Sequence, residues 1–457
     1  MRKYLINKLL QNDGWKDNVL IEVDEKGIIL RINENSVDKE GEHLKGLCLP
    51  GFQNAHSHAF QYAMAGLAEN HSSLGARDDF WSWRESMYQL ALSISPDDME
   101  AIATMLYSEM IRHGYTNVAE FHYLHHDKNG TPYSNLSEMG ERLVSAANTA
   151  GINITLVPIF YQKGGFGKQP TSGQRRFISQ DIEQYLRLLE ASEKTCQNKT
   201  HANLGIGIHS MRGVDTENIK LLAKSGPQKL PFHIHVSEQL KEIEDCINHI
   251  GKRPVEWLLD NISLNENYHL VHATHLTEEE TIGIASSRAN VVLCPTTEGN
   301  LGDGLFPLLN YTEHSGKWSI GTDSHVGINP FEEIRLLDYG QRLTTHKRDI
   351  LAGVNGKSGE NVIKQVTETG RRAMGNYQNN YFEVGTPFNA CIIDSNYPLL
   401  ASTSDPNLLS SIIYTADGRQ ISHTIVNGKV IWDGEKLKNR TVIVDKFNRT
   451  LGILGGR

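Results

Sequence analysis

Residues 49–60 read Leu49-Pro50-Gly51-Phe52-Gln53-Asn54-Ala55-His56-Ser57-His58-Ala59-Phe60, a short apolar run that ends in two histidines. Side chains two positions apart on an extended strand point to the same side of it. The two imidazoles can therefore bind one divalent cation from the end of a strand, and imidazole is a common ligand of zinc, nickel and iron. A single His-x-His pair is a weak signal, because two surface histidines give the same pattern.

Seven further apolar runs of similar length follow, and stretches with helical periodicity separate them. With the first, the runs cover residues 54–58, 117–122, 153–160, 204–209, 232–236, 269–273, 290–294 and 318–322. The intervening periodicity predicts helices that include 96–114, 179–194, 277–287, 330–345 and 361–374. Eight alternations of strand and helix predict an α/β protein built as a (β/α)8 TIM barrel.

The two ends of the chain have a different pattern, with short strands and tight turns. Residues 19–32 predict one hairpin, and residues 423–432 predict another with Asn427-Gly428 as its turn. An N-terminal piece of this length cannot bury a core alone, so we expect it to share a sheet with the C-terminal segment. The expected division is a small β-sandwich from residues 1–50 and 380–457 around a hydrolase barrel at 51–379.

Composition narrows the class of protein. The chain has 457 residues, which allows one large barrel and a smaller domain, and its net charge of −9 argues against nucleic acid as a partner. The five cysteines are scattered and form no Cys-x-x-Cys pair, so neither a disulfide framework nor a thiolate metal site is predicted. No signal-peptide core and no run of 18 apolar residues occurs, which predicts a cytoplasmic protein without a membrane span.

Polar residues stand where several of the predicted strands end. They are His56, His58, His209, His235, His272 and Asp323. Each has an ordinary structural explanation when taken alone, such as a buried histidine that donates to a carbonyl or an aspartate that caps a helix. Barrel enzymes place their chemistry at the carboxyl ends of the strands. We therefore interpret the set as one site.

Three imidazoles and one carboxylate suit a single divalent metal that keeps a position open for water. Such a metal lowers the pKa of its water to about 7. Asp323 can contact both the metal and the water and accept a proton. Glu238, three residues after His235, can transfer a proton to a reacting nitrogen, or it is simply a carboxylate in the first turn of a helix. The same ligands accept iron, nickel or manganese, so metal identity stays open.

Several of these motifs together resemble the amidohydrolase superfamily, in its aminohydrolase branch. They are Pro50-Gly51, His56-x-His58, His235 with Glu238, His272 and Gly321-Thr322-Asp323. Longer stretches at 56–69, 80–88, 119–123 and 233–239 are similar to formimidoylglutamate deiminases. This resemblance implies a zinc enzyme, usually a homodimer, that converts the small anionic substrate N-formimidoyl-L-glutamate to N-formyl-L-glutamate and ammonia in histidine breakdown.

The resemblance also implies a role for each matched residue. Zinc, one ion per subunit, would be held by His56, His58, His235 and Asp323, while Glu238, His272 and Asp323 would move protons and polarise the water. The substrate would be held by Gln61, Arg84, Tyr123, His209 and Arg212. A glutamate-derived substrate carries two carboxylates, and guanidinium groups pair with carboxylates bidentately. Arg84 and Arg212 are thus the expected clamps, although either could equally form a surface ion pair.

Two other classes of function remain open from the sequence. Another aminohydrolase of the same branch would act on guanine, an adenosine derivative or a triazine, but these flat substrates are less anionic and fit two arginines poorly. A catalytically inactive barrel that serves as a scaffold is the second alternative. Such a protein would be expected to lose metal ligands, whereas every candidate ligand is present here.

Overall fold

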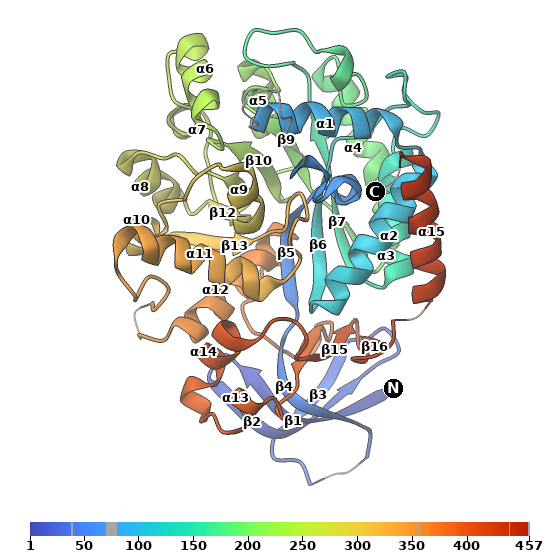
Figure 1. The fold of residues 1–457 in the computed structure, drawn as a ribbon, viewed down its shortest axis with the longest axis vertical. Helices are drawn as coiled ribbons and strands as arrows, with labels where there is room; N and C mark the ends of the chain where they lie inside the picture. The colour runs from blue at the N-terminus through green and yellow to red at the C-terminus, as the bar shows by residue number, and fades with distance from the viewer. Residues whose placement is uncertain (38–39, 70–79, 354–355, 438, 456–457) are drawn as a thin grey trace.

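The computed structural model describes residues 1–37, 40–69, 80–353, 356–437 and 439–455. Figure 1 shows a large α/β body with a smaller sheet at one end. In the described part of the chain, eight parallel strands form the large body: β5 (Phe52–Ser57), β6 (Tyr115–His122), β7 (Asn153–Phe160), β9 (Ile206–Ser210), β10 (Phe232–Val236), β11 (Tyr268–His272), β12 (Asn290–Leu293) and β13 (Lys317–Ile320). A short extra strand, β8 (Ala202–Leu204), pairs with β7.

The first and last of these strands meet and close the ring. A parallel bridge joins Ser57 to Asp323, the amide of His58 donates to the carbonyl of Asp323 (3.1 Å), and the amide of Asp323 donates to the carbonyl of His56 (3.0 Å). The predicted (β/α)8 barrel is therefore confirmed. The eight predicted runs all lie on these strands, with ends that differ by a few residues.

Helices pack around the barrel, and their ends follow the sequence signals. Helix α2 (Pro96–Arg112) begins after Ser95, whose side chain forms a capping box with Asp98. Helix α11 (Pro330–Thr345) begins after Asn329, which caps the amide of Phe331. The other barrel helices are α1 (Phe80–Ser93), α3 (Glu138–Ala150), α4 (Ile182–Cys196), α5 (Thr216–Ser225), α6 (Leu240–Ile250), α7 (Pro254–Asn261), α8 (Glu278–Ser287), α9 (Pro295–Leu301), α10 (Leu308–Glu313) and α12 (Ser358–Ala373), with 3-10 turns at Ala59–Met64, Leu67–Glu69 and Ser172–Gln174.

The chain ends share one seven-stranded sheet, as the sequence predicts. Its order is β16-β15-β14-β4-β1-β2-β3, with bounds Lys429–Trp432, Ile421–Val426, Ala390–Ile393, Glu42–Pro50, Arg2–Gln11, Gly14–Val23 and Ile29–Asn33. The antiparallel pairing of β14 with β4 joins the C-terminal segment to the N-terminal one. The predicted Asn427-Gly428 turn has positive φ at both residues (48° and 62°), as a type I′ hairpin turn requires. This sheet is the expected sandwich domain.

The C-terminal segment also contains helices α13 (Pro398–Ala401), α14 (Asp405–Thr415) and α15 (Arg440–Ile453). Helix α15 lies along α2 of the barrel (Figure 1), and the ring of Phe447 stacks on that of Tyr62, with centroids 5.6 Å apart. The division at residues 50 and 380 stays a prediction, and α15, which falls in its C-terminal part, packs against the barrel helix α2. No helix among the described residues is long and apolar enough to cross a membrane.

Gly321 directly follows β13 and packs closely against His56 of β5. A Cβ atom at this position would lie 2.8 Å from the backbone nitrogen and Cβ of His56. We expect Gly321→Ala to separate the two strands and to destabilise the fold by about 1–3 kcal/mol, because a packed backbone cannot yield without strain. Thermal unfolding would measure this change. Gly452→Ala on α15, where nothing lies within 4 Å of the added methyl group, is the control. Equal unfolding temperatures for the two variants would contradict the prediction.

Candidate functional site

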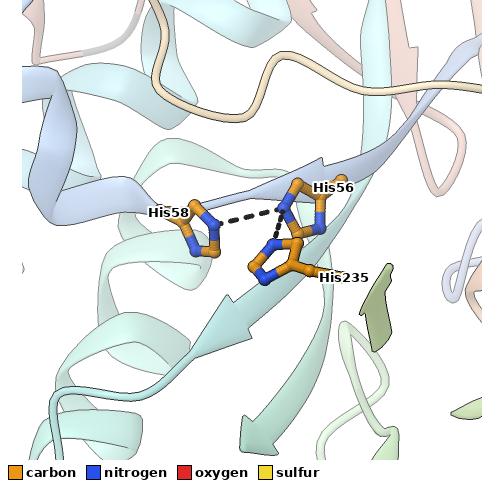
Figure 2. A group of neighbouring side chains, drawn as sticks. All are labelled: His56, His58 and His235. Atoms are coloured by element: carbon orange, nitrogen blue, oxygen red, sulfur yellow. Dashed lines mark hydrogen bonds between the residues drawn. The ribbon is translucent and has the colours of Figure 1, made fainter. Parts of the chain in front are cut away.

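Three buried imidazoles point toward one another at the carboxyl end of the barrel (Figure 2). His56 lies on β5, His58 directly follows it, and His235 lies on β10. The Nε2 atom of His56 is 3.2 Å from that of His58 and 3.0 Å from that of His235. The nitrogens of a tetrahedral zinc site with bonds of 2.0–2.1 Å stand about 3.3 Å apart. The spacing of the three nitrogens therefore fits a single small divalent ion.

Asp323 supplies a carboxylate to the same point. Its Oδ1 atom is 3.2 Å from Nε2 of His58 and 3.5 Å from Nε2 of His56. The structure thus brings together all four residues predicted to bind a metal. A set of three imidazoles and one carboxylate is a suitable donor set for a divalent metal with one open position.

Burial sets the protonation of these donors. Burial lowers the pKa of His56 to about 3 and holds the pKa of His235 well below its usual value, so both rings are neutral and keep a lone pair for a metal. Burial alone would raise the pKa of Asp323, but its contacts with the imidazoles of His56 and His58 outweigh burial and hold that pKa well below its usual range. Nδ1 of His58 lies 2.9 Å from the carbonyl oxygen of Phe121, which fixes the ring with Nε2 toward the centre.

His272 lies between the metal ligands and the predicted acid. Its Nε2 atom is 3.7 Å from Oδ2 of Asp323 and 3.7 Å from Oε1 of Glu238, and its Nδ1 atom is 3.2 Å from Oε1 of Glu298. Burial alone would lower the pKa of His272, but these three carboxylates raise it to about 10. A protonated imidazole at this place donates hydrogen bonds to whatever oxygen develops charge beside the centre.

Glu238 reaches the site from the end of β10, and a guanidinium holds it. Nη2 of Arg212 is 3.2 Å from Oε2 of Glu238, and Nη1 of Arg212 is 2.9 Å from Oε2 of Glu242. All three side chains are buried. The predicted acid therefore lies 3.7 Å from His272 on one side and in an ion pair on the other.

The five predicted substrate residues line one small cavity above this centre. They are Gln61, Arg84, Tyr123, His209 and Arg212, and the cavity also contacts His58, His235, Glu238, His272 and Asp323. Gln61 donates from Nε2 to the hydroxyl of Tyr123 at 2.8 Å, and the guanidinium of Arg84 lies over the Trp81 ring at 4.4 Å. Aromatic and apolar walls come from Phe80, Trp83, Met87, Tyr88, Tyr161 and Leu301.

The backbone is strained where it delivers these side chains. Ser237, His272, Ala273, Asp323 and His325 all have φ between 46° and 67°, a region that residues other than glycine rarely adopt. Ser237 precedes Glu238, and His272 and Asp323 are site residues themselves. Strain of this kind is stored mainly where function requires a fixed side-chain direction.

Three carboxylates of the site were not predicted from the sequence. Glu298 contacts His272, Glu242 contacts Arg212, and Glu120 accepts from the hydroxyl of Ser57 (2.6 Å) and the amide of Ala59 (2.7 Å). Glu120 interrupts an apolar strand, and a buried carboxylate in such a strand is itself a signal. Glu298 follows the seventh strand closely, whereas Glu242 on α6 carries no signal of its own.

Known proteins of similar sequence and fold match nearly the whole chain. The model of the Amidohydrolase family matches residues 47–431. The chain is 40% identical over 437 residues to the formimidoylglutamate deiminase of Pseudomonas aeruginosa, covering 95% of each chain. A crystal structure of an amidohydrolase from Brucella melitensis is 40% identical, covers 99% of this chain and all of that one, and has a TM-score of 0.92. An adenosine deaminase from Xanthomonas campestris with bound zinc, 19% identical with a TM-score of 0.82 and covering 99% of this chain and 98% of that one, shares the fold.

The imidazole geometry gives a direct test of metal binding. We expect His235→Ala to lose most of the bound metal, because it removes one of four convergent donors, and metal analysis of the purified protein measures this. His209→Ala is the matched control, since His209 lines the same cavity but its Nδ1 faces the hydroxyl of Ser210 at 3.0 Å. Equal metal content in the two variants would place the ion elsewhere.

Proposed function

The chain belongs to the amidohydrolase family, and from that premise we propose that it is a zinc-dependent formimidoylglutamate deiminase. It would hydrolyse N-formimidoyl-L-glutamate to N-formyl-L-glutamate and ammonia. One observation supports this substrate above the others of the family. A single cavity contains two guanidinium groups, Arg84 and Arg212, beside a centre of metal donors and proton carriers.

The cavity matches both ends of such a substrate. The two carboxylates of the substrate can pair with the guanidinium groups and accept hydrogen bonds from the neutral donors Gln61 and Tyr123. Its amidine group is a strong base that carries positive charge at neutral pH. The carboxylates of Glu238 and Asp323 also line the cavity, where they favour a cation.

We propose that His56, His58, His235 and Asp323 hold one zinc ion per subunit. Zinc bound there would supply a water whose pKa is lowered to about 7. Asp323 accepts the proton of the attacking water, and His272 stabilises the oxygen that adds to the formimidoyl carbon. The Glu238 carboxylate would first take a proton from the amidinium group and return it to the imino nitrogen as the oxygen adds, and this nitrogen leaves as ammonia once Asp323 passes on the proton that it took from the water.

The wider biological setting follows from the proposed reaction. The substrate is small, so the cavity needs no macromolecular partner. We propose that the protein works as a homodimer in the cytoplasm, in the breakdown of histidine.

The rival functions make different demands on this site. Guanine and adenosine derivatives are flat and carry no carboxylate, so the charge of Arg84, which pairs with no acid among the described residues, would face them without a partner. An inactive scaffold would have no need of four converging donors, one of which, Asp323, lies on strained backbone. Both alternatives fit the site less well than hydrolysis of an amidine that carries two carboxylates.

Ammonia release from several candidate substrates tests the proposal. With zinc-loaded protein we expect turnover of N-formimidoyl-L-glutamate, and at least about 10³-fold lower kcat/KM for guanine and adenosine derivatives, because each charge left unpaired in a buried site costs several kcal/mol. Faster hydrolysis of a purine than of the amidine would refute the assignment.

Glu238 gives a second test of the mechanism. We expect Glu238→Gln to keep its metal and to lose about 10²- to 10⁴-fold in kcat, since the amide has the same shape but cannot donate and regain a proton. Metal analysis and steady-state kinetics measure the two properties separately. Glu244→Gln, an exposed position on α6, serves as the control. Full turnover in Glu238→Gln would remove this residue from proton transfer.

A further inference from the structure

The two arginines of the cavity have opposite surroundings. Arg84 is half-buried, lies over the Trp81 ring and forms no ion pair with any described acid. Arg212 is buried and pairs with two carboxylates, those of Glu238 and Glu242. A substrate carboxylate can therefore bind at Arg84 directly, whereas at Arg212 it meets a group whose charge is already matched.

The charges around Arg212 disfavour the binding of a third carboxylate. One guanidinium and two carboxylates sum to a net negative charge in a buried place, where like charges repel strongly. A substrate carboxylate can join Arg212 only when one of the two resident carboxylates withdraws from it. The guanidinium has donors enough for the exchange, since its five N–H groups form a fixed fork.

Glu238 and Glu242 differ in their freedom to withdraw. The side chain of Glu242 has no exposed surface, and its Oε2 accepts from both Nη1 of Arg212 (2.9 Å) and the backbone amide of Glu238 (3.1 Å). Glu238 lines the cavity, and its hydrogen bond to Arg212 is longer at 3.2 Å. Glu242 is thus anchored on α6, and Glu238 is the carboxylate that can move.

We propose that Arg212 is shared between Glu238 and one carboxylate of the substrate, and that binding of this carboxylate releases Glu238 toward the reacting nitrogen. Glu242 is then a positioning residue that holds the guanidinium during the exchange. This inference rests on the proposed function. It makes recognition of a carboxylate a condition for proton transfer, because Arg212 holds Oε2 of Glu238 until the substrate carboxylate replaces it. The other oxygen of Glu238, Oε1, already lies 3.7 Å from Nε2 of His272, on the side of the reaction.

The exchange predicts which kinetic constant, kcat or KM, changes when a carboxylate is removed from the substrate. Loss of a contact that is made equally in the ground state and the transition state changes KM alone. Loss of a contact that frees the general acid for proton transfer changes kcat. Arg84 belongs to the first kind, since no catalytic group is paired with it. Arg212 belongs to the second kind.

Two truncated amidines test this with the wild-type, zinc-loaded enzyme. They are 4-(formimidoylamino)butanoate and 2-(formimidoylamino)butanoate, each of which lacks one of the two carboxylates. We expect one of them to lose at least about tenfold in kcat, and added acetate to restore part of that rate by occupying Arg212. Two truncated substrates that raise KM and keep the kcat of the parent would overturn the proposal, and so would a lowered kcat that acetate does not raise.

Variants of the chain separate positioning from general damage. Glu242→Gln should lower kcat for the full substrate and weaken the effect of acetate, with metal content unchanged, whereas Glu244→Gln on the exposed face of α6 should behave as wild type. Arg84→Met should raise KM with little change in kcat. A Glu242→Gln enzyme with normal kcat and a normal acetate effect would refute the positioning role. If the wild-type enzyme does not hydrolyse N-formimidoyl-L-glutamate at all, the proposed function has failed, which is a different result from a loss confined to KM.

Discussion

Closure of the barrel between β5 and β13 is the constraint on which the site depends. Asn54 and Thr322, 268 positions apart, exchange two hydrogen bonds across this seam, one from Nδ2 to Oγ1 at 2.7 Å and one from the Thr322 amide to Oδ1 at 3.1 Å. The carbonyl of His56 accepts the amides of both Thr322 and Asp323. The same backbone contacts that complete the barrel thus set the carboxylate of Asp323 against the first two histidines. A barrel left open at this seam would keep its strands but lose the convergence of ligands.

The charge around the centre favours cations, and Arg84 in the same cavity favours an anion. Near the metal donors the acidic groups predominate: Glu238, Glu242, Glu298, Asp303 and Asp323 are all buried. Burial and the charge of Glu238 raise the pKa of Asp303 to about 9, so this carboxyl is neutral and limits the excess. The remaining negative charge suits a divalent ion and a protonated amidine, while Arg84, which pairs with no described acid, suits a carboxylate. Such an arrangement orients a zwitterionic substrate before any chemistry occurs.

The sequence predicted the parts of the site that follow from strand periodicity. His56, His235, His272 and Asp323 each stand at a strand end, so the barrel alone brings them to one edge. Strand periodicity could not predict the carboxylates on helices that contact these strand-end residues. Glu242 meets Arg212 only because α6 packs with one particular rotation, and Glu298 meets His272 because α9 begins directly after β12. The placement of α15 against α2 is likewise a matter of tertiary packing, which short-range patterns do not encode.

A comparison of two buried arginines shows why the cluster around Arg212 serves function. Arg176 donates to the carbonyls of Ala91, Ile94 and His126 and ties three segments together. It pairs with no carboxylate in the part of the chain that the structure describes, and it does not line the cavity. This is how an arginine stabilises a fold. Arg212 instead carries two buried carboxylates, and replacing a buried ion cluster of this kind with apolar side chains is often neutral or stabilising by about 1–4 kcal/mol. Stability therefore does not account for the cluster. A cation that faces the cavity and can change its carboxylate partner does account for it.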